Sequence, residues 1–225
     1  HPGGENEVGG TSLATHPLEV TFHGRSCHIA SLTDSGINAL DCAVELYQKI
    51  KELKKTFPKG AIVGAIFTEA GTAPNVVTPK ATIRMTVRGS TVDDLEGIIL
   101  PAIKAAAQEI AASYGAQVEM HHYEPLFKDM RQDKRLLDLF KAVMTEFGEV
   151  PRILPDDEAD GSTDVGNVSY EVPTAQPTLQ IGLGLEAHTP EFTCAAGSDY
   201  GLAQAIKGAK IMAVVALRYA LLSDT

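Results

Sequence analysis

The sequence has little positive charge. Among its 225 residues, 19 are Lys or Arg and 29 are Asp or Glu, which gives a formal net charge of −10 at pH 7. Proteins that bind nucleic acids or anionic membranes usually carry a basic patch or stripe, and no such stripe is present in this sequence. We therefore expect neither nucleic acid nor membrane as a partner.

Cysteine is scarce as well. The three cysteines, Cys27, Cys42 and Cys194, form no CxxC pair. An odd and widely spaced set does not indicate a disulfide framework and is more typical of a reducing compartment. We therefore expect a cytoplasmic location.

Long apolar runs and the common catalytic signatures are missing too. The most apolar segment, residues 211–222, contains Arg218 and follows Lys210. It is shorter than the roughly 20 residues that cross a bilayer, so we interpret it as a packed helix. The sequence contains no phosphate loop, nucleophile elbow or zinc-finger spacing.

What the sequence does contain is a regular order of elements between residues 17 and 124. Leu18, Val20 and Phe22 alternate with polar residues, as in a half-buried strand. The same kind of pattern predicts further strands at 61–69, 81–87 and 116–123, with helices from about 38 and from Thr91 to Gly115. The order β-α-β-β-α-β is typical of a ferredoxin-like sheet with two helices on one face.

The flanking segments are harder to assign. Residues 1–16 are rich in glycine and read as a loop or linker, and the acidic run 156–160 reads as a solvated loop. After Arg131 the patterns indicate helices near 136–144 and 199–222 but few strands. Because a helical layer needs a sheet to pack on, part of that sheet is expected elsewhere.

His188 follows an apolar run and precedes the last long helix, a place where α/β folds gather catalytic groups. An isolated histidine is more often structural than functional. Its role therefore depends on other motifs.

Four stretches together resemble the M20 family of metal-dependent amidohydrolases and peptidases. LEVTFHGRSCHIA (18–30) is similar to the start of its inserted lid, or dimerisation, domain, and GTAPNVVTPKATIRMTVR (71–88) is similar to its Asn-containing turn and following strand. GSTDVGNVSYEVPT (161–174) and AHTPEF (187–192) resemble the C-terminal part of its catalytic domain. The last two are most similar to the branch with aminobenzoyl-glutamate hydrolase subunits, aminoacylase-like proteins and small dipeptidases.

This resemblance implies an α/β (α+β) fold, in which a ferredoxin-like lid (17–125) is inserted in an incomplete α/β catalytic domain. That domain would comprise a remnant and linker (1–16) and a C-terminal part (126–225). The resemblance further implies a homodimer through the lid, with edge strands pairing between protomers.

The resemblance also assigns roles to individual residues. His188 and His1 match ligands of two divalent metal ions, Zn or Mn, although a terminal residue such as His1 could equally be disordered. His28 matches the lid histidine that crosses the dimer interface and polarises the scissile carbonyl. Asn75 and Arg88 match residues that bind the substrate's carboxylate and orient the amide; Arg84 is an alternative that reads better as an exposed strand residue. The turn departs from the family pattern, because Thr78 stands where a proline is common.

The remaining metal ligands and the Glu general base of the family come from an N-terminal half that has no counterpart in this sequence. We therefore expect a fragment that is inactive alone, from a parent protein that hydrolyses amide bonds in small N-acyl amino acids or dipeptides. The alternative is a non-catalytic ferredoxin-like assembly or small-ligand-binding module. On the hydrolase hypothesis His28, Asn75 and Arg88 should lie on one rim of the lid, and on the alternative they should be scattered. We interpret His16, His23, His121 and His122 as surface residues.

Overall fold

The computed structural model describes residues 1–30, 35–159 and 161–222. The chain forms two compact units, which are described separately below. The inserted unit is Leu13–Asp129, and the discontinuous unit combines His1–Ser12 with Met130–Thr225. Each boundary thus falls four residues from the predicted 16/17 and 125/126.

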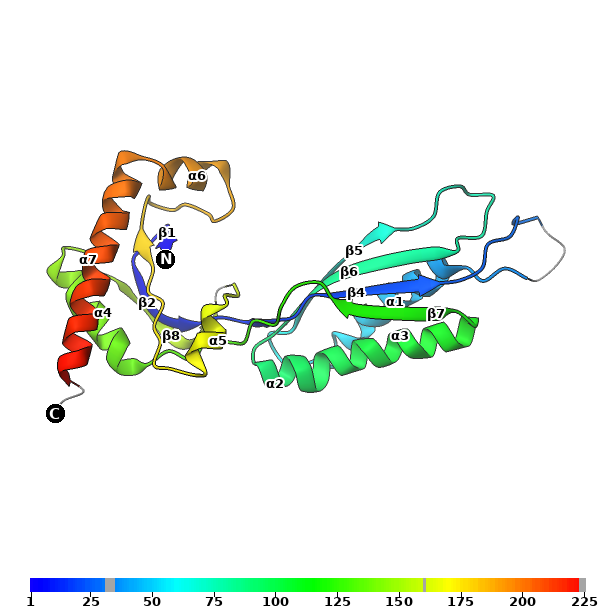
Figure 1. The fold of residues 1–225 in the computed structure, drawn as a ribbon, viewed down its shortest axis with the longest axis horizontal. Helices are drawn as coiled ribbons and strands as arrows, with labels where there is room; N and C mark the ends of the chain where they lie inside the picture. Colours follow the sequence, from blue (N-terminus) through cyan, green and yellow to red (C-terminus); the bar gives the residue numbers. More distant parts are fainter. Residues whose placement is uncertain (31–34, 160, 223–225) are drawn as a thin grey trace. The chain divides into compact units, whose positions relative to one another are not determined.

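The inserted unit is built on one antiparallel sheet. Its four main strands lie in the order β5-β6-β4-β7, with β5 and β7 at the edges (Figure 1). Short β3 pairs with the end of β6. The elements are β3 (Ala14–Thr15), β4 (Leu18–His23), α1 (Ala39–Leu53), β5 (Ile62–Glu69), β6 (Lys80–Gly89), α2 (Val92–Asp94), the π-helix η1 (Leu95–Ile99), α3 (Leu100–Tyr114) and β7 (Gln117–His122). The order confirms the predicted ferredoxin-like pattern.

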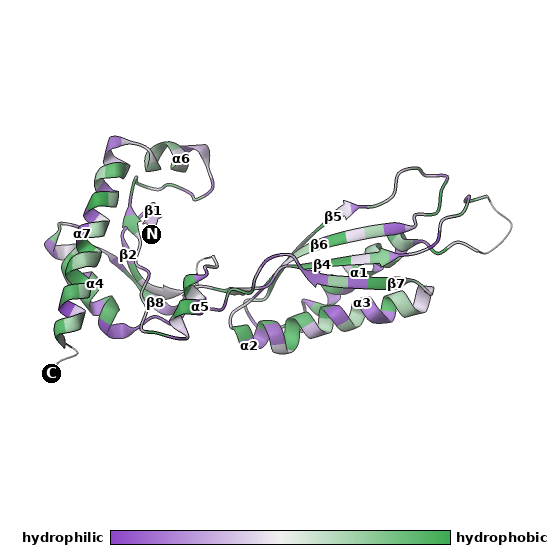
Figure 2. Ribbon diagram, in the orientation of Figure 1, coloured by the Kyte–Doolittle hydropathy of each residue, from purple (hydrophilic) through white to green (hydrophobic). Residues whose placement is uncertain are grey.

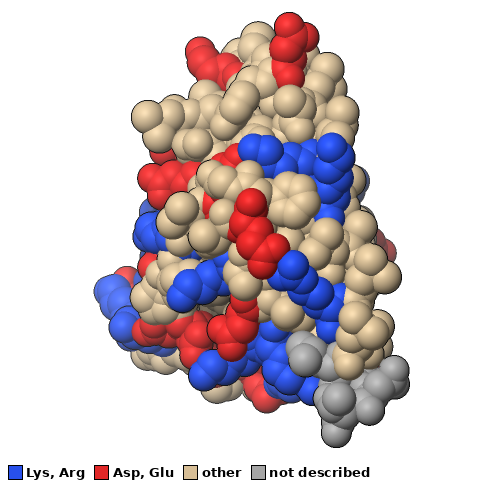
Figure 3. Space-filling model, turned by 90° about the vertical axis from the view of Figure 1, so that its left-hand side faces the viewer, with Lys and Arg blue, Asp and Glu red and all other residues tan. Residues whose placement is uncertain are grey.

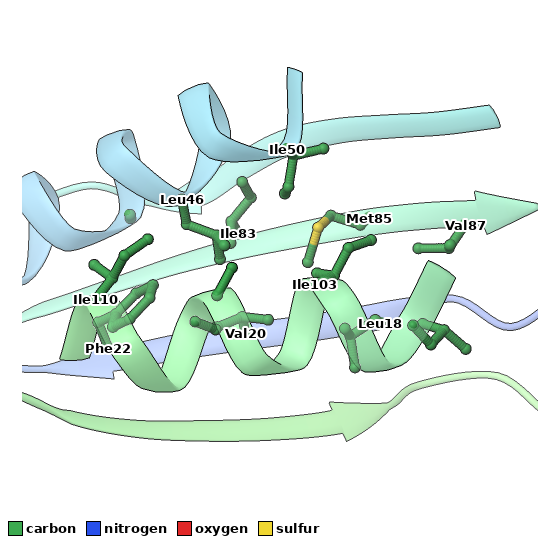
Figure 4. Packing of buried hydrophobic residues seen from close by; sticks show 14 of the residues in the cluster. Leu18, Val20, Phe22, Leu46, Ile50, Ile83, Met85, Val87, Ile103 and Ile110 are labelled. Atoms are coloured by element: carbon green, nitrogen blue, oxygen red, sulfur yellow. The ribbon is translucent and has the colours of Figure 1, made fainter. Parts of the chain in front are cut away.

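The core of the inserted unit lies between the sheet and the two long helices (Figure 4). Alternate residues of β4 and β6 point into it, which is why these strands show a period of two. Helices α1 and α3 each contribute an apolar stripe. The fully or nearly fully buried side chains include Leu18, Val20, Phe22, Leu46, Ile50, Ile83, Met85, Val87, Ile103 and Ile110.

Local sequence fixes the ends of these helices. Asn38 accepts a hydrogen bond from the Leu40 N–H at 3.1 Å and so caps α1. Thr91 caps α2 through the Asp94 N–H at 3.1 Å. Gly115 ends α3 with φ of 67°, a left-handed conformation that glycine adopts at little cost.

The discontinuous unit joins the start of the chain to its end through parallel strand pairs. β1 (Pro2–Gly3) pairs with β9 (Leu179–Gln180), and β2 (Glu7–Thr11) pairs with β8 (Arg152–Ala159). Helices α4 (Lys134–Glu146), α5 (Val165–Ser169), α6 (Pro190–Ala196) and α7 (Asp199–Leu222) complete it. A small buried cluster connects β2, α4 and α7: Val8, Phe140, Val143, Met144, Ile211 and Val215.

Two predictions about this unit were wrong. Residues 1–16 are not a linker, because they contribute β1 and β2 to this unit and β3 to the inserted unit. The glycines permit close strand approach: a Cβ atom on Gly9 would lie 2.7 Å from the Leu154 carbonyl oxygen. The acidic run is not a loop up to residue 159, because β8 extends to Ala159. Arg152 pairs with Glu7 and Glu158, which offsets part of the acidic charge in the strand.

Helix α7 packs along one side only. Ile211 and Val215 are buried, whereas apolar side chains elsewhere on the helix are exposed, including Leu202, Ile206, Met212, Leu217 and Leu221. Figure 2 shows hydrophobic positions along much of α7. Within the described part of the chain, α7 is the one helix that could cross a membrane by length and composition. The prediction of a packed helix is therefore correct for one face of α7.

Charged side chains on this unit are mixed in sign. Figure 3 shows basic and acidic groups interspersed over the face that includes α4 and α7. Lys207 pairs with Glu149 at 2.5 Å, and Arg218 pairs with Glu146 at 2.7 Å. The Arg218 guanidinium holds the pKa of the Glu146 carboxyl below its ordinary value.

Candidate functional site

The structure brings His28 and Asn75 together at one end of the inserted unit. The loop after β4 and the loop before β6 pair with each other there. His28 and Val76 form an antiparallel bridge, and the Ile29 N–H donates to the Asn75 carbonyl oxygen at 3.1 Å. Both predicted site residues are exposed. We call this end of the sheet, with His28 and Asn75, the tip.

The tip is held by backbone hydrogen bonds and borders a pocket. The Val77 N–H donates to the Cys27 carbonyl oxygen at 2.9 Å, one residue from each partner of the bridge. The pocket, of about 340 Å³, is lined by Ile29, Asn38, Leu40 and loop residues between 70 and 78. Loops that are pinned in this way can present side chains with little loss of conformational entropy on binding.

Arg88 lies at the opposite end of the sheet. It pairs with Thr15 on one side and with Ile62 on the other, near the end of β6. Asn75 precedes the start of β6 at Lys80, and the strand rises about 3.3 Å per residue, so roughly 26 Å separates Lys80 from Arg88. The expectation that His28, Asn75 and Arg88 share one rim is therefore wrong for Arg88, because nearly the whole of β6 separates Arg88 from His28 and Asn75.

Arg84 is an exposed strand residue, as its alternation predicted. Its guanidinium pairs with Glu19 on the neighbouring strand and lies 5.1 Å from the centre of the Tyr123 ring. The Glu19 carboxylate raises the pKa of Arg84. These contacts occupy Arg84 on the exposed face of the strand.

His1 is ordered within the discontinuous unit. Its carbonyl oxygen accepts from the Leu179 N–H at 2.8 Å, next to the β1–β9 pair. Its ring Nδ1 lies 2.7 Å from the Pro2 carbonyl oxygen, which can only accept, so Nδ1 carries the proton. The lone pair of Nε2 remains, and this is the tautomer of a histidine that binds a metal through Nε2.

His188 is exposed and has φ of 63°, the one positive φ among the described residues other than glycine. A left-handed conformation at a non-glycine residue costs on the order of 1 kcal/mol and is found most often at functional sites. Thr189 then begins α6 by accepting from the Phe192 N–H at 3.2 Å. His188 thus directly precedes the capping residue of α6.

The donor set fits a metal site only in part. Among the residues that the structure describes, no group of three or more His, Cys, Asp or Glu side chains is arranged to hold a metal ion. His1 has the tautomer that leaves Nε2 available, and His188 is exposed on a left-handed backbone. The described residues therefore place no third His, Cys, Asp or Glu side chain with His1 or His188, and their role as metal ligands stays a prediction.

Sequence reasoning missed a histidine pair at the base of the inserted unit. The rings of His16 and His122 stack with centres 3.4 Å apart. His16 lies 2.5 Å from the Glu96 carboxylate, and His122 lies 2.9 Å from the Lys104 amine. Burial, together with the charges of His16 and Lys104, lowers the pKa of His122. The surface interpretation was wrong for these two residues. No pattern in the sequence brings them together, because their contact depends on the pairing of Leu18 with His122 across β4 and β7.

The chain is similar in sequence to known peptidases. Residues 17–115 match the family described as the peptidase dimerisation domain of the M20 peptidases. The chain is 28% identical over 220 residues to a Xaa-Arg dipeptidase of Mus musculus, covering 96% of this chain and 51% of the relative. It is 28% identical over 161 residues to a peptidase T of Streptococcus pyogenes, covering 68% of this chain and 37% of the relative.

A solved structure shares the fold. The aminobenzoyl-glutamate utilization protein of Klebsiella pneumoniae superimposes with a TM-score of 0.65 at 18% identity, covering 87% of this chain and 49% of that one. The chain thus spans about half the length of the relatives it matches. Residues 17–115 thus match the M20 peptidase dimerisation domain, and the predicted resemblance of the chain to the M20 peptidases is confirmed.

Proposed function

We propose that the parent protein of this chain hydrolyses amide bonds in small dipeptides or N-acyl amino acids. The similarity to a Xaa-Arg dipeptidase over 96% of the chain supports this activity. The observation that carries the proposal is the tip, where His28 and Asn75 are exposed side by side on a dimerisation domain. An imidazole N–H and a carboxamide are suited to polarise and orient a substrate amide.

The distances within the inserted unit support a site to which two protomers contribute residues. A dipeptide spans only two residues, about 7 Å at 3.3–3.6 Å per residue, whereas roughly 26 Å separates the two ends of β6. One inserted unit therefore cannot bring both Arg88 and the tip to the same substrate. In our proposal, His28 and Asn75 of one protomer act in the partner's site, and Arg88 binds a substrate carboxylate bidentately at the other end of the sheet.

The proposed dimer uses the free edge of β5. This strand pairs only with β6 in the described part of the chain, and it exposes Ile62 by 48%, Ile66 by 64% and Phe67 by 38%. The other edge, β7, is shorter and exposes Glu119 and His121. Charged edges resist pairing and long apolar edges favour it. We propose that two copies of β5 pair across a two-fold axis.

M20 peptidases are generally metal-dependent. In our proposal His1 and His188 would hold one or both of two divalent ions, Zn or Mn, through neutral imidazole. Such an ion, when bound, would act as a Lewis acid toward the scissile carbonyl. His1 is prepared for this role by its Nδ1–H bond to the Pro2 carbonyl oxygen. The identity of the metal is part of the test below.

The experiment is an assay of the parent protein against a panel of dipeptides and N-acyl amino acids with Zn²⁺ or Mn²⁺. We expect turnover that a chelator abolishes, and a loss of roughly 100-fold or more in kcat for His28→Ala, by analogy with removal of one oxyanion donor. His121→Ala, an exposed strand histidine of the same unit, is the matched control. Failure to hydrolyse any member of the panel would refute the proposed activity.

The 225-residue chain by itself should be inactive in the same assay, because its described residues do not assemble three metal ligands. Robust metal-dependent turnover by this chain would contradict that expectation. The separation of Arg88 from the tip favours the competing possibility, a non-catalytic assembly module. That possibility predicts a dimer whose parent protein has no hydrolase activity under any metal.

We also propose a cytoplasmic location, supported by the three free thiols of Cys27, Cys42 and Cys194. Fractionation of the source cells tests this directly. Recovery of the parent protein in an oxidising compartment would contradict it.

A further inference from the structure

The tip contains one hydrogen bond whose direction fixes the chemistry of His28. The Ala30 backbone N–H donates to His28 Nδ1 at 3.1 Å. A backbone N–H can only donate, so Nδ1 must be the unprotonated nitrogen of the ring. In the neutral imidazole the proton then sits on Nε2.

We propose that the Ala30 amide is a positioning group that locks His28 in the neutral Nε2–H tautomer, so that the tip presents a hydrogen-bond donor. A ring with Nδ1 occupied and Nε2 protonated has no lone pair for a metal ion or for a proton from substrate. His28 would therefore polarise a carbonyl oxygen and would act neither as a metal ligand nor as a general base. The purpose of this lock rests on the function proposed above, whereas its existence does not.

The surrounding backbone supports a lock rather than a chance contact. His28 is bridged to Val76, and the neighbouring residues Cys27 and Ile29 each exchange one backbone hydrogen bond with the segment 75–77. The ring of an exposed histidine would otherwise lose rotamer freedom only when substrate binds. With the Ala30 bond in place, part of that entropy is lost on folding.

Other histidines of the chain show the opposite arrangement. His122 Nδ1 lies 3.0 Å from the Pro17 carbonyl oxygen, and its Nε2 lies 2.9 Å from the Lys104 amine. A carbonyl accepts and an ammonium donates, so neutral His122 carries its proton on Nδ1. The backbone therefore selects different tautomers at His28 and at His122, and the two rings can be compared in one sample.

The test is NMR of the full chain with ¹⁵N-labelled histidine and backbone. Long-range proton–nitrogen correlations report which ring nitrogen is protonated, and a scalar coupling across the N–H···N bond links the Ala30 amide nitrogen to His28 Nδ1. We expect unprotonated Nδ1 with this coupling for His28, and protonated Nδ1 for His122. A protonated His28 Nδ1, or no coupling to Ala30 in the neutral state, would overturn the inference.

Two variants sharpen the result. Ala30→Pro has no N–H, so the coupling should disappear and His28 should populate both tautomers; Ala30→Gly keeps the N–H and should retain the wild-type tautomer. In the parent protein, Ala30→Pro should lower kcat about tenfold, the effect of one net hydrogen bond, and Ala30→Gly should leave kcat within about twofold. Equal losses in both variants would refute the positioning role.

These outcomes separate the inference from the proposed function. A locked His28 in a parent protein without hydrolase activity would leave the lock standing and remove its proposed purpose. An active parent protein in which His28 exchanges freely between tautomers would support the proposed activity and refute the lock.

Discussion

Substitution of Ile66 by lysine tests the β5 edge as the dimer interface. Ile66 lies in the second half of β5 and exposes 64% of its surface. Full burial of an isoleucine is worth about 2 kcal/mol. If pairing covers about half of the exposed part, each protomer loses roughly 0.7 kcal/mol in the variant, and the two-fold axis doubles this to about 1.4 kcal/mol. Burying part of two like-charged lysine side chains adds a similar cost, so Ile66→Lys should weaken the dimer about 100-fold.

Sedimentation velocity over a concentration series measures this change. The wild-type chain should sediment as a dimer, and Ile66→Lys should shift toward the monomer as concentration falls. Ile98→Lys is the matched control, since Ile98 in η1 is 49% exposed and lies away from the β5 edge. A variant dimer as tight as wild type, or an equal effect of Ile98→Lys, would refute the assignment of β5.

Three further predictions concern stability. Leu46→Ala removes a fully buried side chain of α1 and should lower the free energy of unfolding by about 3 kcal/mol, measured by urea titration followed by circular dichroism. Val44 on the same helix is 39% exposed, and Val44→Ala should cost about 0.5 kcal/mol or less. Folding lowers the pKa of His122 from 6.5, so the unfolded chain binds more protons than the folded chain just below that pH. The free energy of unfolding should therefore fall as pH drops below 6.5. His122→Gln should remove this dependence, and an unchanged pH profile would contradict the assignment. Asp133 caps α4 through the Leu136 N–H at 3.0 Å, so Asp133→Ala should cost about 1 kcal/mol while Asp133→Asn retains most of the cap, and equal losses would argue against capping.

The inserted unit could be predicted because its signals are local. Alternation along β4 and β6, the Thr91 cap and the Gly115 stop each arise within one element, and their order indicates a single topology. The predicted helix from Thr91 was correct in place but not in detail, since its first turns form α2 and a π-helical segment. Nothing in the apolar spacing distinguishes a π-helical turn from an α-helical one.

The discontinuous unit was predicted less well because its strands depend on distant partners. Gly9 and Gly10 resemble a linker in sequence, yet Gly9 is needed for the close approach of β2 to β8. The candidate residues matched to family motifs could be named from sequence, but their separation could not. Asn75 and Arg88 are 13 positions apart, and only the extended path of β6 places them at opposite ends of the sheet.

The parallel pairs β1–β9 and β2–β8 have a consequence for how the chain folds. They join the first dozen residues to segments beyond residue 150, so an unfolded insert of about 117 residues lengthens the loop between β2 and β8 from about 23 to about 140 residues. The longer loop adds about 1.6 kcal/mol of closure entropy. Within the insert, Thr15 and Phe127 exchange two backbone hydrogen bonds of 2.8 and 2.9 Å, which hold its entry and exit side by side. Once the insert has folded, the remaining closure between β2 and β8 spans about 23 residues, α4 among them. Folding of the insert before the terminal strands pair therefore lowers the entropic cost of forming β1–β9 and β2–β8.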